Sequence, residues 1–202
     1  MEGLFVARGI IVSNETVRNW CVKFGNQYSS QIRKKRSQLG DMWYLDEVFI
    51  KKNGVLHYLW RAVDQDGDEL DILIQKRRNK KAVMKFFKKL LKGQQATPLK
   101  LVTDKLRSYS TAKRKIMPSV AHSTQQYENN HCELSHHPGR QQERQMRRFT
   151  SQGQAQRFLA YHGIVNNLFR LGRHKMQADN DRILRERAFN EWAGVSCVQN
   201  LA

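Results

Sequence analysis

The fold of this chain is decided by the stretch WYLDEVFIKKNGVLHYLWRAVDQDG, residues 43–67. Two runs rich in β-branched and aromatic residues flank Asn53 and Gly54, a pair that favours the tight turn of a β-hairpin. A second turn, DQDGDE at residues 64–69, leads into another apolar run, LDILIQ at 70–75. The stretch therefore predicts a three-strand antiparallel meander.

Helical and extended patterns alternate after the meander. Residues 79–93, NKKAVMKFFKKLLKG, predict a helix that Gly93 ends, and LKLVTD at 99–104 predicts a short strand. A helix over 105–117 and a short strand over 119–123 should follow, and from Asn129 onward the pattern is helical. This order predicts an α/β fold in which helices flank a mixed sheet, with parallel strands added to the meander.

The first 40 residues have a different character. Residues 1–26 predict a partial helix-turn-helix DNA-binding region, in which Ser13 caps a helix. Val17, Trp20, Cys21 and Phe24 would form the core face of that helix, and Arg18, Asn19 and Lys23 would lie on a face that could meet DNA. An ordinary amphipathic helix is the alternative. Residues 27–40, with RKKR at 33–36, predict a basic linker.

The composition favours a polyanionic partner. Lys and Arg number 36 against 18 acidic residues, for a formal net charge of +18, so nucleic acid is the first candidate. No apolar run reaches the roughly 20 residues of a membrane span, and we expect no membrane partner. The three scattered cysteines suit a reducing compartment, and we expect a cytoplasmic, nucleoid-associated protein.

Several acids follow or interrupt the apolar runs. Asp46 and Glu47 are neighbours on one strand, where successive side chains point to opposite faces, so only one of them can serve a given site. Asp104 ends a strand, and Glu133 lies in the first turn of a predicted helix. Each acid alone has a structural explanation as a cap or turn residue. Together, oxygen donors at one sheet edge suit Mg²⁺, and two such ions serve phosphoryl transfer.

These motifs resemble a known family. The meander stretch, LVTDKLRSY at 101–109, NNHCELSH at 129–136 and RQQERQMRRF at 140–149 are similar to those of DDE transposases of bacterial insertion sequences, in the insertion-sequence-six family. The resemblance implies an RNase H-like catalytic domain over 41–170 and a C-terminal helix and tail over 171–202. It also implies that Asp46, Asp104 and Glu133 are catalytic and hold two Mg²⁺ or Mn²⁺ ions, with Glu143 as the nearest rival for the third acid.

The implied activity is metal-dependent DNA cleavage and strand transfer by two-metal, in-line phosphoryl transfer. The implied partners are the terminal inverted repeats of the element and target DNA, bound by a homo-oligomer. Basic residues near the acids could contact phosphates. They are Arg77, Arg78, Lys105, Arg107, Arg140, Arg144, Arg147 and Arg148.

Departures from the family pattern leave alternatives open. The chain begins within the expected helix-turn-helix, which indicates an N-terminal truncation, and His131, Cys132 and Leu134 around Glu133 differ from the usual residues. A catalytically inactive remnant that only binds DNA is one alternative, and a nuclease without joining activity is another. If Asp46 is the catalytic acid, Glu47 should have a Lys or Arg partner from a covering helix. Convergence of Glu47 with the other two acids would instead mean that the strand faces the other way.

Overall fold

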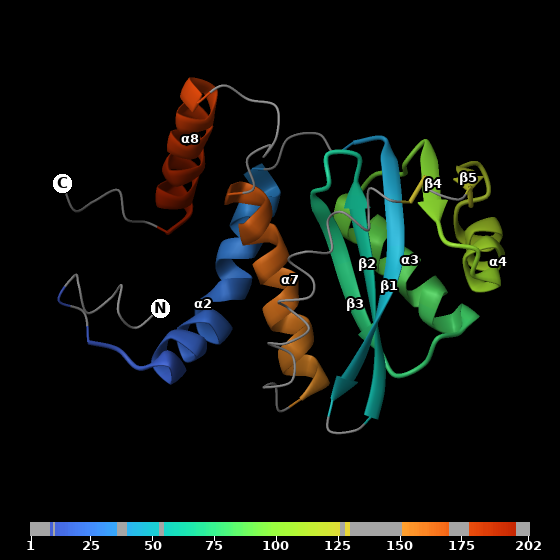
Figure 1. Cartoon of the computed structure of the whole chain (residues 1–202), viewed down its shortest axis with the longest axis horizontal. Helices are drawn as coiled ribbons and strands as arrows, with labels where there is room; N and C mark the ends of the chain where they lie inside the picture. The colour runs from blue at the N-terminus through green and yellow to red at the C-terminus, as the bar shows by residue number, and fades with distance from the viewer. Residues whose placement is uncertain are drawn as a thin grey trace. The chain divides into compact units, whose positions relative to one another are not determined.

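The structure, a computed structural model, describes residues 9, 11–35, 40–52, 55–125, 128–129, 151–169 and 178–196, with the side chains of residues 14, 17, 18, 51 and 52 left out. Its elements, labelled in Figure 1, are α2 (Asn14–Lys35), β1 (Met42–Lys52), β2 (Val55–Asp64), β3 (Glu69–Gln75), α3 (Lys80–Gln94), β4 (Lys100–Thr103), α4 (Arg107–Ile116), β5 (Ala121–Ser123), α7 (Gln152–Phe169) and α8 (Ala178–Ser196). The chain divides into two units, one of residues 37–163 and one of residues 1–36 with 164–202.

The larger unit is built on a mixed sheet with the strand order β3-β2-β1-β4-β5. Strands β1, β2 and β3 pair antiparallel, and β4 and β5 run parallel to β1. Lys52 pairs with Val55, so only two residues connect β1 to β2, as in the predicted hairpin. In the second turn the Asp64 carboxylate accepts the N–H of Asp68 at 2.8 Å, and Gly67 has a φ of 80° that favours glycine. The predicted meander and the mixed sheet are confirmed.

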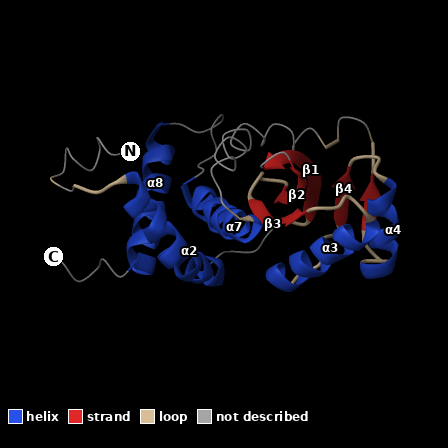
Figure 2. Cartoon of the chain, turned by 90° about the horizontal axis from the view of Figure 1, so that it is seen from below, coloured by secondary structure: helices blue, strands red, loops and turns tan. Residues whose placement is uncertain are grey.

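Helices cover both faces of this sheet. On one face, α3 and α4 contribute Phe86, Phe87 and Tyr109 to a core that includes Trp43 and Leu45 of β1 (Figure 2). On the other face, the first part of α7 packs against the meander through a second buried cluster. That cluster contains Ile50, Leu59, Ile72, Ile74, Ala155 and Leu159. The two faces of β1 are therefore buried in different layers, so successive residues of this strand lie in different environments.

Helix α3 shows how local sequence sets an element's ends. The Asn79 side chain accepts the N–H of Ala82 at 3.0 Å and caps the first turn. The prediction that Gly93 ends the helix was wrong, because Gly93 lies inside α3. Gln95 takes the left-handed position instead, with a φ of 53°, and donates its N–H to the carbonyl of Leu91.

The smaller unit corrects the prediction for the N-terminal region. Helix α2 continues through Lys35, so residues 27–35 are helical and not a linker. Its buried positions are Gly25, Ser29 and Ile32, whereas Trp20, predicted to be a core residue, is 45% exposed. Thr16 donates its N–H to the Ser13 side chain at 3.2 Å, in the predicted capping role. The structure describes one helix before residue 40, and the helix-turn-helix stays a prediction.

The reason for this difference lies in tertiary contacts. Ile32 of α2 packs with Ile164 at the end of α7 and with Val195 of α8, flanked by Tyr28 and Trp192. The apolar partners of α2 therefore come from the other end of the chain, more than 100 residues away. No helix among the described residues is long and apolar enough to cross a membrane.

Candidate active site

Two of the predicted acids lie next to each other on neighbouring parallel strands, where the pairing of β1 with β4 ends. Leu45 of β1 and Thr103 of β4 form the last register pair between these strands, and Asp46 and Asp104 are the next residue on each. Because adjacent strands lie about 4.8 Å apart, the backbones of the two acids are close together. Ligand sites in α/β proteins commonly form at the carboxyl ends of parallel strands.

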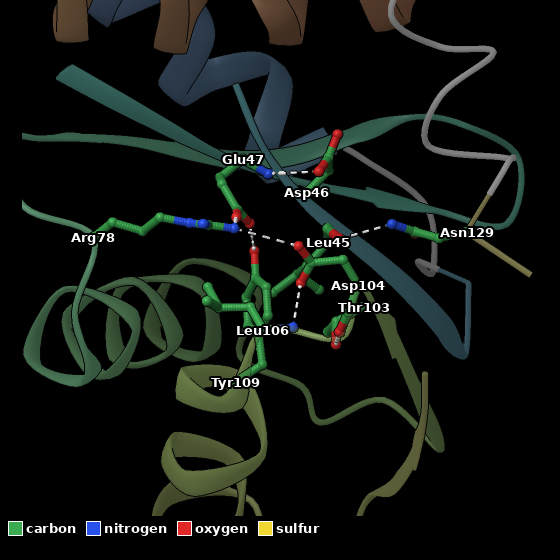
Figure 3. A network of polar contacts seen from close by, with 9 residues as sticks. All are labelled: Leu45, Asp46, Glu47, Arg78, Thr103, Asp104, Leu106, Tyr109 and Asn129. Atoms are coloured by element: carbon green, nitrogen blue, oxygen red, sulfur yellow. Dashed lines mark hydrogen bonds and ion pairs between the residues drawn. The ribbon is translucent and has the colours of Figure 1, made fainter. Parts of the chain in front are cut away.

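Both acids are held by the backbone around them, as Figure 3 shows. Asp46 is half-buried, and its Oδ1 accepts the N–H of Glu47 at 2.8 Å. The side chain of Asp104 is 37% exposed, and its Oδ1 accepts the N–H of Leu106 at 3.0 Å, in the turn that leads into α4. Asp104 therefore stabilises this turn, as the sequence allowed for a single acid. It also lies in the candidate site.

Glu47 lies on the opposite face of β1 from Asp46, toward α3 and α4. Its side chain is only 2% exposed, accepts the hydroxyl of Tyr109 at 2.9 Å and forms an ion pair with Arg78. Burial, and next the nearby charge of Asp104, raise the pKa of Glu47, while Tyr109 and Arg78 counteract this rise. Burial, and next the Glu47 charge, raise the pKa of Tyr109 well above its ordinary value, so this hydroxyl stays a proton donor.

Arg78 links Glu47 to Asp104. Its Nη2 pairs with Glu47 and lies 3.6 Å from Asp104 Oδ2, and its guanidinium sits 5.4 Å from the centre of the Phe49 ring. The expected cationic partner of Glu47 is thus present, although it lies in the loop before α3 and not on a helix. Glu47 and Asp104 therefore share Arg78 as a partner. The sequence pattern indicated Arg78 as a phosphate contact only.

Asn129 ties the segment before the third predicted acid to this site. Its Nδ2 donates to the carbonyl of Leu45, the residue before Asp46, at 3.1 Å. Glu133 follows four residues later, and four residues span at most about 14 Å. Asn129 is the described residue that precedes Glu133 most closely in the sequence. Glu133, its rival Glu143, and Arg140, Arg144, Arg147 and Arg148 lie outside the described residues.

The other predicted DNA contacts are distributed over both units. Arg77, Lys105 and Arg107 are exposed near the strand ends. Asn19 and Lys23 are exposed on α2, where the side chain of Arg18 is not described. Within the described ranges, no three His, Cys, Asp or Glu side chains form a metal-binding cluster.

Comparison with known proteins identifies the family of this chain. Residues 40–172 match the family model described as a DDE domain, and the chain belongs to this family of insertion-sequence transposases. It is 33% identical over 134 residues to the Staphylococcus aureus transposases for the insertion sequence-like element IS431mec (strain Mu50) and for the insertion sequence element IS257 in transposon Tn4003. This match covers 64% of the chain and 59% of each relative's length.

Two solved structures are also similar. The HTLV-2 integrase catalytic core domain in complex with magnesium has 17% identity and a TM-score of 0.40, over 78% of this chain and 87% of that one. The simian T-cell lymphotropic virus intasome in complex with PP2A regulatory subunit B56 gamma has 13% identity and a TM-score of 0.48. This match covers 71% of this chain and 52% of that one.

Proposed function

We propose that this chain carries the catalytic domain of an insertion-sequence transposase that cleaves a DNA strand and joins its 3′ end to target DNA. The observation that carries the proposal is the placement of Asp46 and Asp104 directly after the last register pair of two parallel strands. Membership of the DDE-domain family and the net charge of +18 support the same activity.

The donor set at the strand ends fits a hard divalent cation. Asp46 and Asp104 offer carboxylate oxygens with solvent access, and Glu133 would complete the set, so these three residues would hold two Mg²⁺ or Mn²⁺ ions. When bound, such ions stabilise the attacking and leaving oxygens of a phosphodiester. Glu47 fits this role poorly, because its buried carboxylate already has Tyr109 and Arg78 as partners.

Basic side chains beside the acids would hold the DNA. Lys105 and Arg107 are exposed shortly after Asp104 in the sequence, and Arg77 is exposed next to Arg78, so these side chains would pair with phosphates and orient the strand. The DNA would be the terminal inverted repeats of an element together with its target. We further propose that the chain works as a homo-oligomer on DNA in the bacterial nucleoid.

Substitution of each acid by its amide tests the proposal. Asp46→Asn, Asp104→Asn and Glu133→Gln should each lower Mg²⁺-dependent strand transfer at least about a thousandfold, because catalytic metal ions contribute several kcal/mol. Affinity for the same DNA in the absence of metal should change by no more than a few-fold. Glu143→Gln is the matched control for the third acid, and Asp66→Asn, in the exposed turn between β2 and β3, is the control for the aspartates.

The assay also separates the alternatives. Retained strand transfer in all three variants would show that the triad is wrongly assigned. Salt-sensitive DNA binding by the unsubstituted protein, without turnover in Mg²⁺ or Mn²⁺, would identify a DNA-binding remnant. Cleavage that is never followed by joining would identify a nuclease.

A further inference from the structure

A guanidinium lies between Asp104 of the site and the buried Glu47 beside it. Arg78 Nη2 pairs with the buried Glu47 on one side and lies 3.6 Å from Asp104 Oδ2 on the other. Figure 3 shows the side chain of Arg78 directed at Glu47 and Asp104, and the Tyr109 hydroxyl directed at the Glu47 carboxylate. Arg78 is therefore held at its position by Glu47 and next to Asp104 at the same time.

This position conflicts with a second cation on Asp104. A divalent ion on the Asp104 carboxylate would lie within a few ångströms of the guanidinium, and like charges at that distance repel strongly in a partly buried site. Glu47 offers Arg78 a second anionic partner on the face of β1 away from Asp46. The guanidinium can therefore move away from Asp104 and still keep one anionic partner, Glu47.

We propose that Arg78 is a placeholder cation, which neutralises Asp104 while no divalent ion is bound and, after the ion binds, pairs with a phosphate of the DNA. Glu47 is then a positioning residue, because it keeps the guanidinium beside the site in both states. Planar guanidinium groups bind phosphate in a bidentate manner, which suits this second role. The inference rests on the proposed function, since it requires a metal ion on Asp104.

The test is Mn²⁺ affinity of the free protein, measured by titration calorimetry. Arg78→Gln removes the competing cation and should bind Mn²⁺ about tenfold more tightly. Glu47→Gln leaves Asp104 as the main anionic partner of Arg78 and should bind Mn²⁺ more weakly. Arg77→Gln is the matched control, because it removes the same charge from the same loop and should leave the affinity within about twofold.

DNA measurements and a second variant complete the design. In Arg78→Gln the KM for DNA should rise about tenfold, since a charge-assisted phosphate contact is lost. The double variant Glu47→Gln with Arg78→Gln buries no unpaired charge, so it guards against misfolding of the single variants, and it should also bind Mn²⁺ tightly. Equal Mn²⁺ affinity in the Arg77 and Arg78 variants, or tighter binding by Glu47→Gln, would overturn the proposal.

Failure of the proposed function gives a different result. If the unsubstituted protein neither binds Mn²⁺ nor transfers strands, both the proposed function and the placeholder role are wrong. If the unsubstituted protein binds Mn²⁺ and transfers strands, while the Arg78 variants bind Mn²⁺ like the Arg77→Gln control, only the placeholder role is wrong.

A second, independent feature is a stripe of lysines on α3. Lys81, Lys85, Lys88 and Lys92 follow one another at helical spacings of four, three and four residues, and all are exposed. The buried side chains of α3 lie on the opposite face. The helix contains no acidic residue, and among the described residues only Lys89 of its lysines has an ion pair, with Asp71.

An ordinary solvated helix usually mixes both signs of charge at these spacings. We infer that this α3 lysine stripe binds the backbone of duplex DNA, as a surface for target DNA of any sequence. The stripe extends over about 16 Å of helix, which suits successive phosphates along one strand. Lysine ammonium groups contact phosphates as point charges and read no bases, so the surface should be indifferent to sequence.

The test is the salt dependence of binding to a random-sequence duplex. The triple variant Lys85→Gln, Lys88→Gln and Lys92→Gln should reduce the slope of log affinity against log salt by up to about 2.7, since each lost phosphate contact removes about 0.9. The matched control substitutes the exposed Arg182, Arg185 and Arg187 of α8 by Gln. If the control reduces the slope as much as the stripe variant, net charge explains the effect and the proposed surface is wrong.

Discussion

At the scale of the residue, two adjacent acids on one strand have opposite environments. Glu47 is enclosed between the sheet and α4, and its burial is compensated by a guanidinium and a phenol. Asp46 remains half-buried at the end of the β1–β4 pairing. An unpaired carboxylate at the position of Glu47 would be costly, so this buried residue needs the cation that the loop before α3 provides.

A histidine on α7 should make stability sensitive to acid. His162 stacks on Phe158, and burial lowers its pKa below the ordinary value of 6.5. The unfolded chain therefore binds a proton at a higher pH than the folded protein does. The stability that comes from the neutral ring is complete above pH 6.5 and is lost as the pH falls below it, by at most about 1.4 kcal/mol per pH unit.

Urea unfolding at pH 7.5 and pH 5.5 checks this prediction. The free energy of unfolding should fall less between these values in His162→Gln than in the unsubstituted protein. Glu47, whose pKa is raised, changes stability in the opposite direction, but both proteins carry it and the comparison removes its effect. An equal loss in both proteins would show that His162 does not contribute.

At the scale of the element, α7 meets the sheet through a glycine. A methyl group on Gly163 would lie 1.8 Å from Glu69 Oε1, and Glu69 is itself buried in an ion pair with Arg61 at 3.0 Å. The helix reaches this position because residue 163 has no side chain. The buried carboxylate of β3 cannot easily move aside, since it would lose its partner.

Two glycine substitutions should therefore change stability in opposite directions. Gly163→Ala should lower the free energy of unfolding by about 1–3 kcal/mol through overpacking. Gly93→Ala should raise it by about 0.5–1 kcal/mol, because Gly93 is exposed inside α3 and its nearest neighbour would lie 3.7 Å away. Urea unfolding of both variants measures the difference, and a neutral Gly163→Ala would contradict the close contact.

Local patterns were sufficient for most elements of the larger unit. The meander followed from two turn sequences between apolar runs, and α3, β4 and α4 followed from periodicity and strand length. The end of α3 was less predictable, because Gln95 and not a glycine takes the left-handed position. The prediction of a linker after residue 26 was wrong, since α2 continues there and residues of α8 complete its apolar face.

At the scale of the whole molecule, the sequence predicted where the acids lie along the chain better than it predicted which residues they contact. The position of Asp104 at a strand end could be anticipated from the sequence, whereas Asp46 lies inside β1 and its place beside Asp104 depends on the pairing of β1 with β4. A cationic partner for Glu47 could be anticipated too, but its identity as Arg78 could not, because the ion pair joins residues 31 positions apart through a loop. The grouping of α2 with α8 in one unit likewise depends on contacts between the two ends of the chain.

The sequence by itself determined the mixed sheet, the family and the position of Asp104 at a strand end, because hydrophobic periodicity, turn residues and motif order are local properties of the chain. Only the tertiary structure decided which acid of the Asp46–Glu47 pair is buried with a partner, and which cation stands beside Asp104. The physical reason is that burial and ion pairing depend on which distant segments share a face of the sheet, and strand alternation alone does not name those segments.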